Sequence, residues 1–134
     1  MKKVLFACVH NSGRSQMAEA FFNHLAKGKA VATSAGTRPA AHVDRTVAEA
    51  MREIGLDVRQ QRPKPLTLEM VEDADRAITM CCNVGEVCPA SFVPTEDWTL
   101  EDPEGQPLEK VREIRDEIKA RVEKLLSEVE EAKE

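Results

Sequence analysis

The sequence predicts an α/β domain built on a parallel sheet, and two observations lead to that class. Residues 4–9 are continuously apolar rather than alternating, which is typical of a central parallel strand covered on both faces. Further along the chain, short apolar stretches alternate with segments whose apolar residues recur at helical spacing. In such sheets the ligand binds beyond the carboxyl ends of the strands. Polar residues that follow a predicted strand are therefore the first candidates for function.

Length and composition exclude several classes of protein. The 134 residues are predicted to form a single domain over 1–134, and a hydrophobic share of 42% is enough for one core. The net charge of −5 leaves no basic surplus to neutralise a phosphate backbone, so we expect no nucleic acid as a partner. No apolar run reaches the length of a membrane span, so we expect no membrane partner either.

The apolar run near the amino terminus and the number of cysteines indicate the cellular compartment of the protein. The apolar stretch after Lys3 is too short for a signal peptide and ends at His10, so we expect a cytoplasmic protein. Its four cysteines are then reduced at rest, and four are too few for a disulfide scaffold at this length. Catalytic or metal-binding roles explain them better than a structural one.

The first half of the chain is predicted to hold two strands and two helices. The strand over 4–9 ends in the polar turn 10–14, and a helix with one apolar face follows. That face comprises Met17, Ala18, Phe21, Phe22 and Leu25. Residues 30–34 form the second predicted strand. A second helix is predicted over 44–54, with Gly55 as its cap.

The second half is predicted to complete the sheet and to end in a long helix. Residues 59–65 are polar and carry two prolines, so we expect a loop there. A short helix is predicted over 66–72, a third strand over 76–81, and the beginning of a short fourth strand over 91–94. From Leu108 onward, apolar residues recur at steps of three and four. This last helix is expected to pack on the sheet, with a dimer interface as the alternative.

The polar turn between the first strand and the first helix has the pattern C-x5-R-S. It comprises Cys8, Val9, His10, Asn11, Ser12, Gly13, Arg14 and Ser15. A loop of this length can point successive backbone N–H groups at one centre, and the following helix adds its positive amino-terminal end. The turn therefore predicts an oxyanion-binding loop.

Four side chains of this loop have predicted roles. Arg14 offers a planar fork that matches a tetrahedral oxyanion, and Cys8 lies in the same positive field, which favours a nucleophilic thiolate. Ser15 can donate a hydrogen bond to that thiolate, and Asn11 can pin the loop. Two alternatives remain. Cys8 can be a buried structural cysteine with an arginine nearby by chance, or an inert neighbour in a loop that only binds the anion.

Residues 8–22 resemble the phosphate-binding loop and first helix of the low-molecular-weight tyrosine phosphatase superfamily, which includes the thioredoxin-coupled arsenate reductases. Residues 33–36 resemble the second-strand motif of both branches. Trp98 with 102–105 resembles the segment that carries the family's acid aspartate, which is Asp102 here. The resemblance covers essentially the whole chain. It implies a four-stranded parallel sheet flanked by helices.

The two branches share the loop, so other residues must separate them. A phosphatase would hydrolyse phosphate monoesters through a phosphocysteine, with Cys8, Arg14 and Asp102 as its catalytic residues. A reductase needs more thiols, and Cys81 and Cys88 match the spacing of the second and third cysteines of the arsenate reductases. Gln16, where phosphatases usually carry proline, also favours the reductase. So does the absence of tyrosine, because the phosphatases usually carry aromatic residues near the acid aspartate.

The resemblance implies a thiol relay that needs no cofactor. Cys8 attacks arsenate, Cys81 attacks Cys8 so that arsenite leaves, and Cys88 takes the disulfide over from Cys81. Thioredoxin is the expected reductant of the final disulfide. Cys82 is an alternative to Cys81 in this relay. A zinc site built from these cysteines is disfavoured, because adjacent cysteines rarely share one tetrahedral ion, and we predict no metal site.

Many members of the family bind potassium beside the loop. Asn11, Glu19 and Ser34 match three of the family's ligands, but the region of the later ligands reads Arg-Pro-Lys-Pro over 62–65. The ammonium group of Lys64 is expected to take the place of the ion, since both are compact positive charges with oxygen partners. The alternative is a solvated loop lysine.

Overall fold

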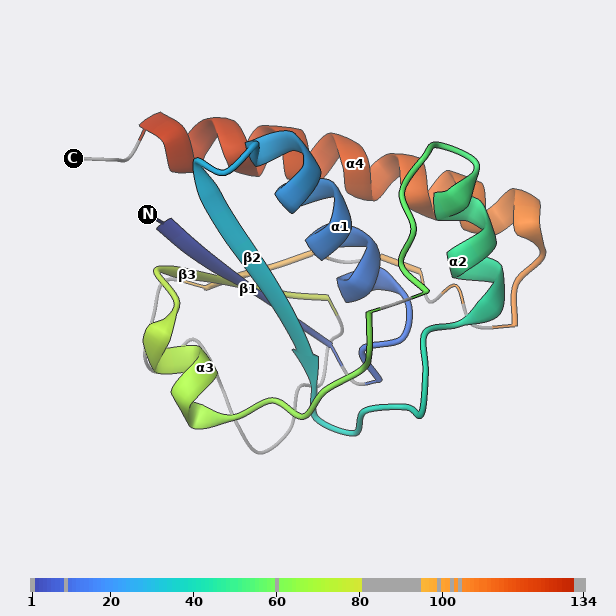
Figure 1. Cartoon of the computed structure of the whole chain (residues 1–134), viewed down its shortest axis with the longest axis horizontal. Coiled ribbons are helices and arrows are strands. Elements are labelled where there is room, and N and C mark those ends of the chain that lie inside the picture. The colour runs from blue at the N-terminus through green and yellow to red at the C-terminus, as the bar shows by residue number, and fades with distance from the viewer. Residues whose placement is uncertain are drawn as a thin grey trace.

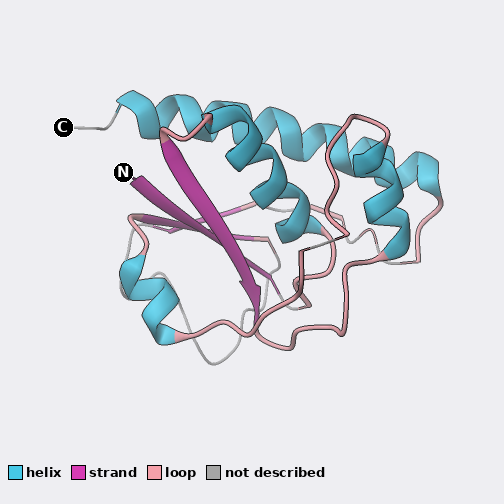
Figure 2. Cartoon of the chain, viewed as in Figure 1, coloured by secondary structure: helices cyan, strands magenta, loops and turns pink. Residues whose placement is uncertain are grey.

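A four-stranded parallel sheet forms the centre of the molecule, in the order β2-β1-β3-β4 (Figures 1 and 2). The computed structural model describes residues 2–8, 10–59, 61–80, 95–98, 100–101, 103 and 105–131. Its strands are β1 (Lys2–Cys8), β2 (Ala30–Gly36), β3 (Arg76–Thr79) and β4 (Thr95–Asp97). The predicted fold class is confirmed.

In the part of the chain that the structure describes, four helices cover the two faces of this sheet. They are α1 (Arg14–Ala26), α2 (Arg45–Arg52), α3 (Leu68–Asp73) and α4 (Leu108–Glu131). Figure 1 shows α1, α2 and α4 grouped on one side of the sheet and α3 on the other. The apolar side of α4 is buried in the larger core, so this helix packs on its own domain. None of the helices in the described part of the chain has the length and apolar character that crossing a bilayer requires.

Strand β1 is buried on both faces, as its continuous apolar run predicts. Alternate side chains of a strand point to opposite faces. Val4, Phe6 and Cys8 accordingly join the large core under α1 and α4, while Leu5 joins a smaller cluster that includes Val71 of α3. The sheet is thus closed to solvent above and below its central strand, and the open end of β1 is where chemistry can take place.

The register brings the carboxyl ends of three strands together. Cys8 pairs with Gly36 of β2, and Ala7 pairs with Thr79 of β3. The chain leaves β1 for β2 on one side and later returns to β3 on the other, so the strand order switches at β1. This is the place where open α/β sheets bind their ligands, and Cys8 is the residue that the sheet delivers there.

Several predicted boundaries are wrong by a few residues, and capping explains two of them. The second helix begins at Arg45, because the Asp44 side chain accepts the N–H groups of Thr46 and Val47. It ends at Arg52 rather than at 54. The third helix begins at Leu68 rather than 66, because Thr67 caps it.

The strands lie close to their predicted positions in the chain, but their lengths differ from the predicted ones. The second strand runs on to Gly36, and the third ends at Thr79, before the predicted end at 81. A fourth strand is present over Thr95–Asp97. The predicted start of that strand, 91–94, lies outside the described residues.

Candidate active site

The loop after β1 is held from outside by the segment 37–44. Every second backbone carbonyl of the loop accepts a hydrogen bond from a backbone N–H of this segment. The carbonyl of Cys8 accepts from Thr37 (3.1 Å), that of His10 from Ala40 (2.9 Å) and that of Ser12 from Asp44 (2.8 Å). In a trans peptide the C=O and the following N–H point in opposite directions. The N–H groups of Asn11 and Gly13 therefore point toward the inside of the loop. Of these, Asn11 N–H donates to the sulfur of Cys8 at 3.1 Å.

The Cys8 thiol is free, buried and held by two hydrogen bonds. Its Sγ lies 2.9 Å from Ser15 Oγ and 3.1 Å from Asn11 N. Asn11 Nδ2 donates to Ser15 Oγ at 2.7 Å, so the serine oxygen acts there as an acceptor and its own proton can point at the sulfur. Asn11 N–H therefore donates to the sulfur, and the Ser15 hydroxyl can donate to it as well, so these two groups fix the position of Sγ.

Asn11 is the centre of the loop's hydrogen bonds. It is fully buried, with a φ of 54° in the left-handed region that asparagine tolerates better than most residues. Its Oδ1 accepts from Gln16 Nε2 (3.1 Å) and from Lys64 N (3.0 Å), and its backbone carbonyl also accepts from Gln16 (3.0 Å). With the bonds to Ser15 and Cys8, each side-chain polar atom of Asn11 has a partner.

Gln16 and Gln61 support the loop from behind. Gln16 is fully buried, and its Oε1 accepts a hydrogen bond from Gln61 Nε2. Neither the burial of Gln16 nor its contact with Gln61 was predicted from the sequence. Gln16 stands about 100° around the helix from Met17, on the side away from the predicted apolar face, so no periodic signal marked it as buried. Nothing in the sequence pairs it with a residue 45 positions away.

The amino-terminal end of α1 is open to an anion. Its N-cap is Gly13, no side chain among the described residues caps it, and its first turn carries no acidic residue. The first N–H groups of a helix lack partners within it, and with the helix dipole they attract negative charge. Arg14 follows at the start of the helix, half-buried, with Nη1 donating to Leu100 O at 3.0 Å.

The segment around Leu100 packs directly on this loop. A Cβ at Gly13 would lie 2.9 Å from Pro103 Cγ, so only glycine allows the approach. Trp98 anchors the segment, because its buried ring contacts Phe6 at 5.8 Å between centroids. These contacts bring the neighbours of Asp102 to the loop, although Asp102 itself lies outside the described residues.

The remaining predicted residues fall into two groups. His10 is exposed, with Nδ1 at 3.2 Å from Arg38 O, and Ser12 is half-buried. Val9, Cys81, Cys82 and Cys88 lie outside the described residues, so their roles stay predictions.

The predicted supports Asn11, Glu19, Ser34 and Lys64 make polar contacts beside the loop. Ser34 Oγ donates to Glu19 Oε1 at 2.6 Å, and Lys64 Nζ lies 3.9 Å from the same oxygen. Asn11 Oδ1 accepts two N–H groups. The replacement of a potassium ion by Lys64 stays a prediction. The described residues contain no cluster of three or more histidine, cysteine or acidic side chains able to hold a metal.

Comparison with known proteins identifies the family. The family model described as low molecular weight phosphotyrosine protein phosphatase matches residues 3–134. The chain belongs to this family. It is similar to a glutaredoxin arsenate reductase of Synechocystis, with 41% identity over 96% of this chain and 99% of that protein.

Solved structures agree with this assignment. An arsenate reductase in a phosphate-binding state has 40% identity and a TM-score of 0.85, covering 96% of this chain and 98% of its own. A thioredoxin-dependent arsenate reductase of Corynebacterium glutamicum has 36% identity and a TM-score of 0.84. The match covers 99% of this chain and 64% of that longer one.

Proposed function

We propose that this protein reduces arsenate to arsenite, with the loop after β1 as the arsenate site. The observation that carries the proposal is the position of the Cys8 sulfur, which lies within hydrogen-bond distance of Ser15 Oγ and Asn11 N in a loop whose N–H groups at Asn11 and Gly13 face inward. Arsenate is a tetrahedral oxyanion, which such a loop and an arginine fork recognise. Relatives named as arsenate reductases, at up to 41% identity, support arsenate as the substrate.

The first step uses residues of the loop. The Cys8 thiolate attacks arsenic, an As–S bond forms and an As–O bond breaks, and the oxygen leaves as water with two protons from dihydrogen arsenate. The inward N–H groups, the start of α1 and Arg14 balance the charge on the arsenate oxygens. Arsenic remains As(V) in this adduct.

Two further cysteines complete the reduction. Cys81 attacks Cys8 Sγ, an S–S bond forms, and the As–S bond breaks with its electron pair going to arsenic, which leaves as arsenite. Cys88 then attacks Cys81, a Cys81–Cys88 disulfide forms, and the Cys8 thiolate is released. We prefer Cys81 to Cys82 for the middle position, because its spacing to Cys88 matches that of the arsenate reductases.

Thioredoxin is the proposed reductant of the final disulfide. The name of one relative specifies glutaredoxin and that of a solved structure specifies thioredoxin, so both systems must be compared. We further propose that residues 1–134 act as a single domain in the cytoplasm, where reducing conditions keep the relay thiols reduced. Asn11, Ser15, Glu19, Ser34 and Lys64 are proposed as supports of the loop.

The test is arsenate-dependent NADPH oxidation with either the thioredoxin or the glutaredoxin–glutathione system. Serine variants of Cys8, Cys81 and Cys88 should abolish turnover, whereas Cys82→Ser serves as the matched control and should retain it. Retained turnover in Cys81→Ser together with its loss in Cys82→Ser would exchange these two roles. No turnover in the wild type with either system would reject the reductase. Cys8-dependent hydrolysis of an aryl phosphate, with Asp102 as the acid, would then identify a phosphatase.

A further inference from the structure

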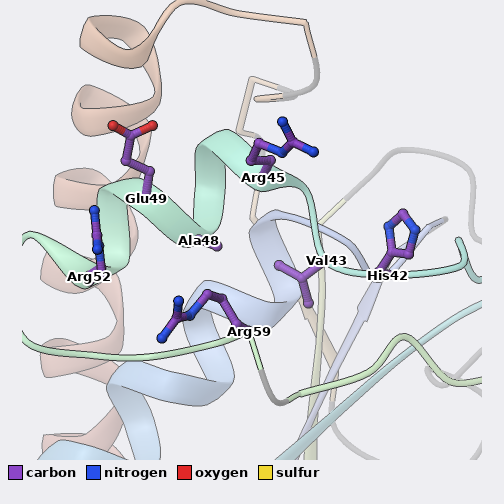
Figure 3. Close-up of a pocket in the computed structure, with 7 residues that line it drawn as sticks. All are labelled: His42, Val43, Arg45, Ala48, Glu49, Arg52 and Arg59. Carbon is purple, nitrogen blue, oxygen red and sulfur yellow. The ribbon is translucent and has the colours of Figure 1, made fainter.

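A second polar feature lies beside the loop, on the outer side of α2. An open groove of about 540 Å³ runs along this helix (Figure 3). Its floor is apolar, with Val43 and Ala48 buried. Its rim is charged and exposed, with Arg45, Glu49 and Arg52 from α2 and Arg59 from the following segment. This volume lies within the range of small-molecule sites in proteins.

The charged side chains on the α2 side of the groove have no direct polar contact. In the part of the chain that the structure describes, the side chains of Arg45, Glu49 and Arg52 make no hydrogen bond or ion pair, although Arg52 acts on Asp57 and Glu49 on Arg112 through longer-range electrostatics. Arg59 differs, because its Nε and Nη2 donate to the two carboxylate oxygens of Asp57, each at 3.0 Å. Among the described residues, the groove therefore presents two guanidinium groups and one carboxylate whose hydrogen-bonding atoms face no protein partner.

The spacing of these three charges is set by the helix. Arg45 and Arg52 are seven residues apart, so they lie on one face about 10.5 Å apart along the axis. Glu49 lies between them, about one turn from each, and Figure 3 shows the three side chains spread along α2. An extended peptide of three residues spans roughly 10 Å. Its two ends can reach both arginines at once.

We propose that this groove binds a small peptide that carries two carboxylates and one ammonium group. Arg45 and Arg52 would each take a carboxylate through a forked hydrogen bond, and Glu49 would take the ammonium. Val43 and Ala48 would cover the ligand's methylene groups. Glutathione has this set of charges and serves as the template for the probe. A ligand with negative charges alone fits less well, because Glu49 would repel it.

The groove lies next to the segment that holds the loop after β1. Its floor and its rim are continuous with the segment that holds the loop, since Asp44 N donates to Ser12 O at 2.8 Å. Val47 of the same helix lies 3.7 Å from the Cβ position of Gly13. A peptide in the groove would thus lie on the flank of the loop. Its binding does not depend on the proposed arsenate reduction.

The test is calorimetric titration of the full chain with S-methylglutathione, whose blocked thiol cannot form a mixed disulfide. Binding to the wild type is expected in the millimolar range or below. The double variant R45Q/R52Q should weaken it about tenfold or more, because two charge-assisted hydrogen bonds are lost. E49Q should weaken it severalfold. The matched control K119Q/K124Q removes two charges from exposed positions of α4 and should leave the affinity within a factor of two.

Two further ligands make the test specific. The diethyl ester of S-methylglutathione lacks both carboxylates and should not bind, and triglutamate should bind more weakly than S-methylglutathione. The proposal is overturned by absent binding in the wild type, by equal losses in R45Q/R52Q and the control, or by tighter binding of triglutamate. Circular dichroism of each variant verifies that it is folded. All of these outcomes can be measured even if the protein does not reduce arsenate, because the titration measures only binding of the peptide.

Discussion

The loop around Cys8 and the contact between α2 and α4 are both made by polar side chains, yet their surroundings differ. In the loop, Asn11 and Gln16 are fully buried, and their amide groups are bonded to the protein. Between the helices, Glu53 accepts from Arg112 Nη2 at 2.6 Å and from Arg115 Nη1 at 3.0 Å. There the Glu53 side chain keeps 32% of its surface exposed.

The difference in burial decides what each group of contacts can do. A buried polar atom that loses its partner cannot turn to water, and this costs about 1–3 kcal/mol. A surface ion pair is screened by solvent and contributes little by comparison. We therefore expect the loop to control the geometry of Cys8 and the helix contact to make a modest contribution to stability.

Removing the centre of the loop should have the largest effect. Asn11→Ala removes the acceptor of the Lys64 N–H and one of the two acceptors of Gln16 Nε2, and it places alanine at a left-handed φ of 54°. We expect the free energy of unfolding to fall by about 2–4 kcal/mol. Turnover at saturating arsenate should fall by about a hundredfold, corresponding to roughly 2.7 kcal/mol. Urea denaturation and steady-state kinetics measure the two effects.

A matched control separates stability from activity. The Asn23 side chain accepts a hydrogen bond from Ala32 N (2.8 Å) and donates one to Ala32 O (3.1 Å), but it lies away from the loop. Asn23→Ala should lower the free energy of unfolding and leave turnover nearly unchanged. Equal losses of turnover in the two variants would contradict a special role for Asn11.

The next effect tests the support behind the loop. Gln16→Met keeps the volume of the side chain but removes both of its bonds to Asn11, while the bond from Lys64 N remains. Turnover should fall about tenfold, corresponding to roughly 1.4 kcal/mol, with a smaller change in the KM for arsenate. Alkylation of Cys8 by iodoacetamide should also slow at neutral pH, because the sulfur is less well held. An unchanged alkylation rate would show that Gln16 packs in the core without positioning Cys8.

A smaller effect tests the ammonium of Lys64. Lys64→Met keeps the backbone bond to Asn11 and removes the positive charge 3.9 Å from Glu19. Turnover should fall severalfold, and potassium chloride should restore more of it than sodium chloride. The same turnover in the variant and the wild type, in either salt, would make Lys64 a solvated loop lysine.

The smallest effect belongs to the contact between the helices. Hydrogen bonds from Arg112, with those from Arg115, hold the pKa of Glu53 below its ordinary value of 4.5. Because the folded state lowers this pKa, the stabilisation is present above pH 4.5 and is lost as the pH falls through the folded value. Glu53→Gln should lower Tm slightly at neutral pH, and this difference should disappear in acid and shrink with salt. A difference that grows in acid would contradict the assignment.

Local pattern predicted much of this molecule. The apolar run of β1 predicted a strand buried on both sides, and the helix after it followed from one apolar face. The loop between them was readable because cysteine, arginine and serine stand at a spacing that one turn can wrap around an anion. Capping side chains were harder to predict, and Asp44 and Thr67 begin their helices later than the apolar pattern suggested.

Contacts between segments that are distant in the sequence could not be predicted from local patterns. The carbonyls of the loop are held by residues 37–44, and Gln16 meets Gln61 from a segment 45 positions later. No local preference encodes such pairs, because they form only when the sheet and helices bring separate parts of the chain together.

The identities and order of the residues specified the elements and the chemistry of the loop, since helix and strand periodicity and the C-x5-R-S spacing are local properties. Packing in three dimensions specified which polar side chains support Cys8. It also determined which charged side chains of α2 make no hydrogen bond or ion pair with the described residues, because such contacts need a neighbour supplied by a different element.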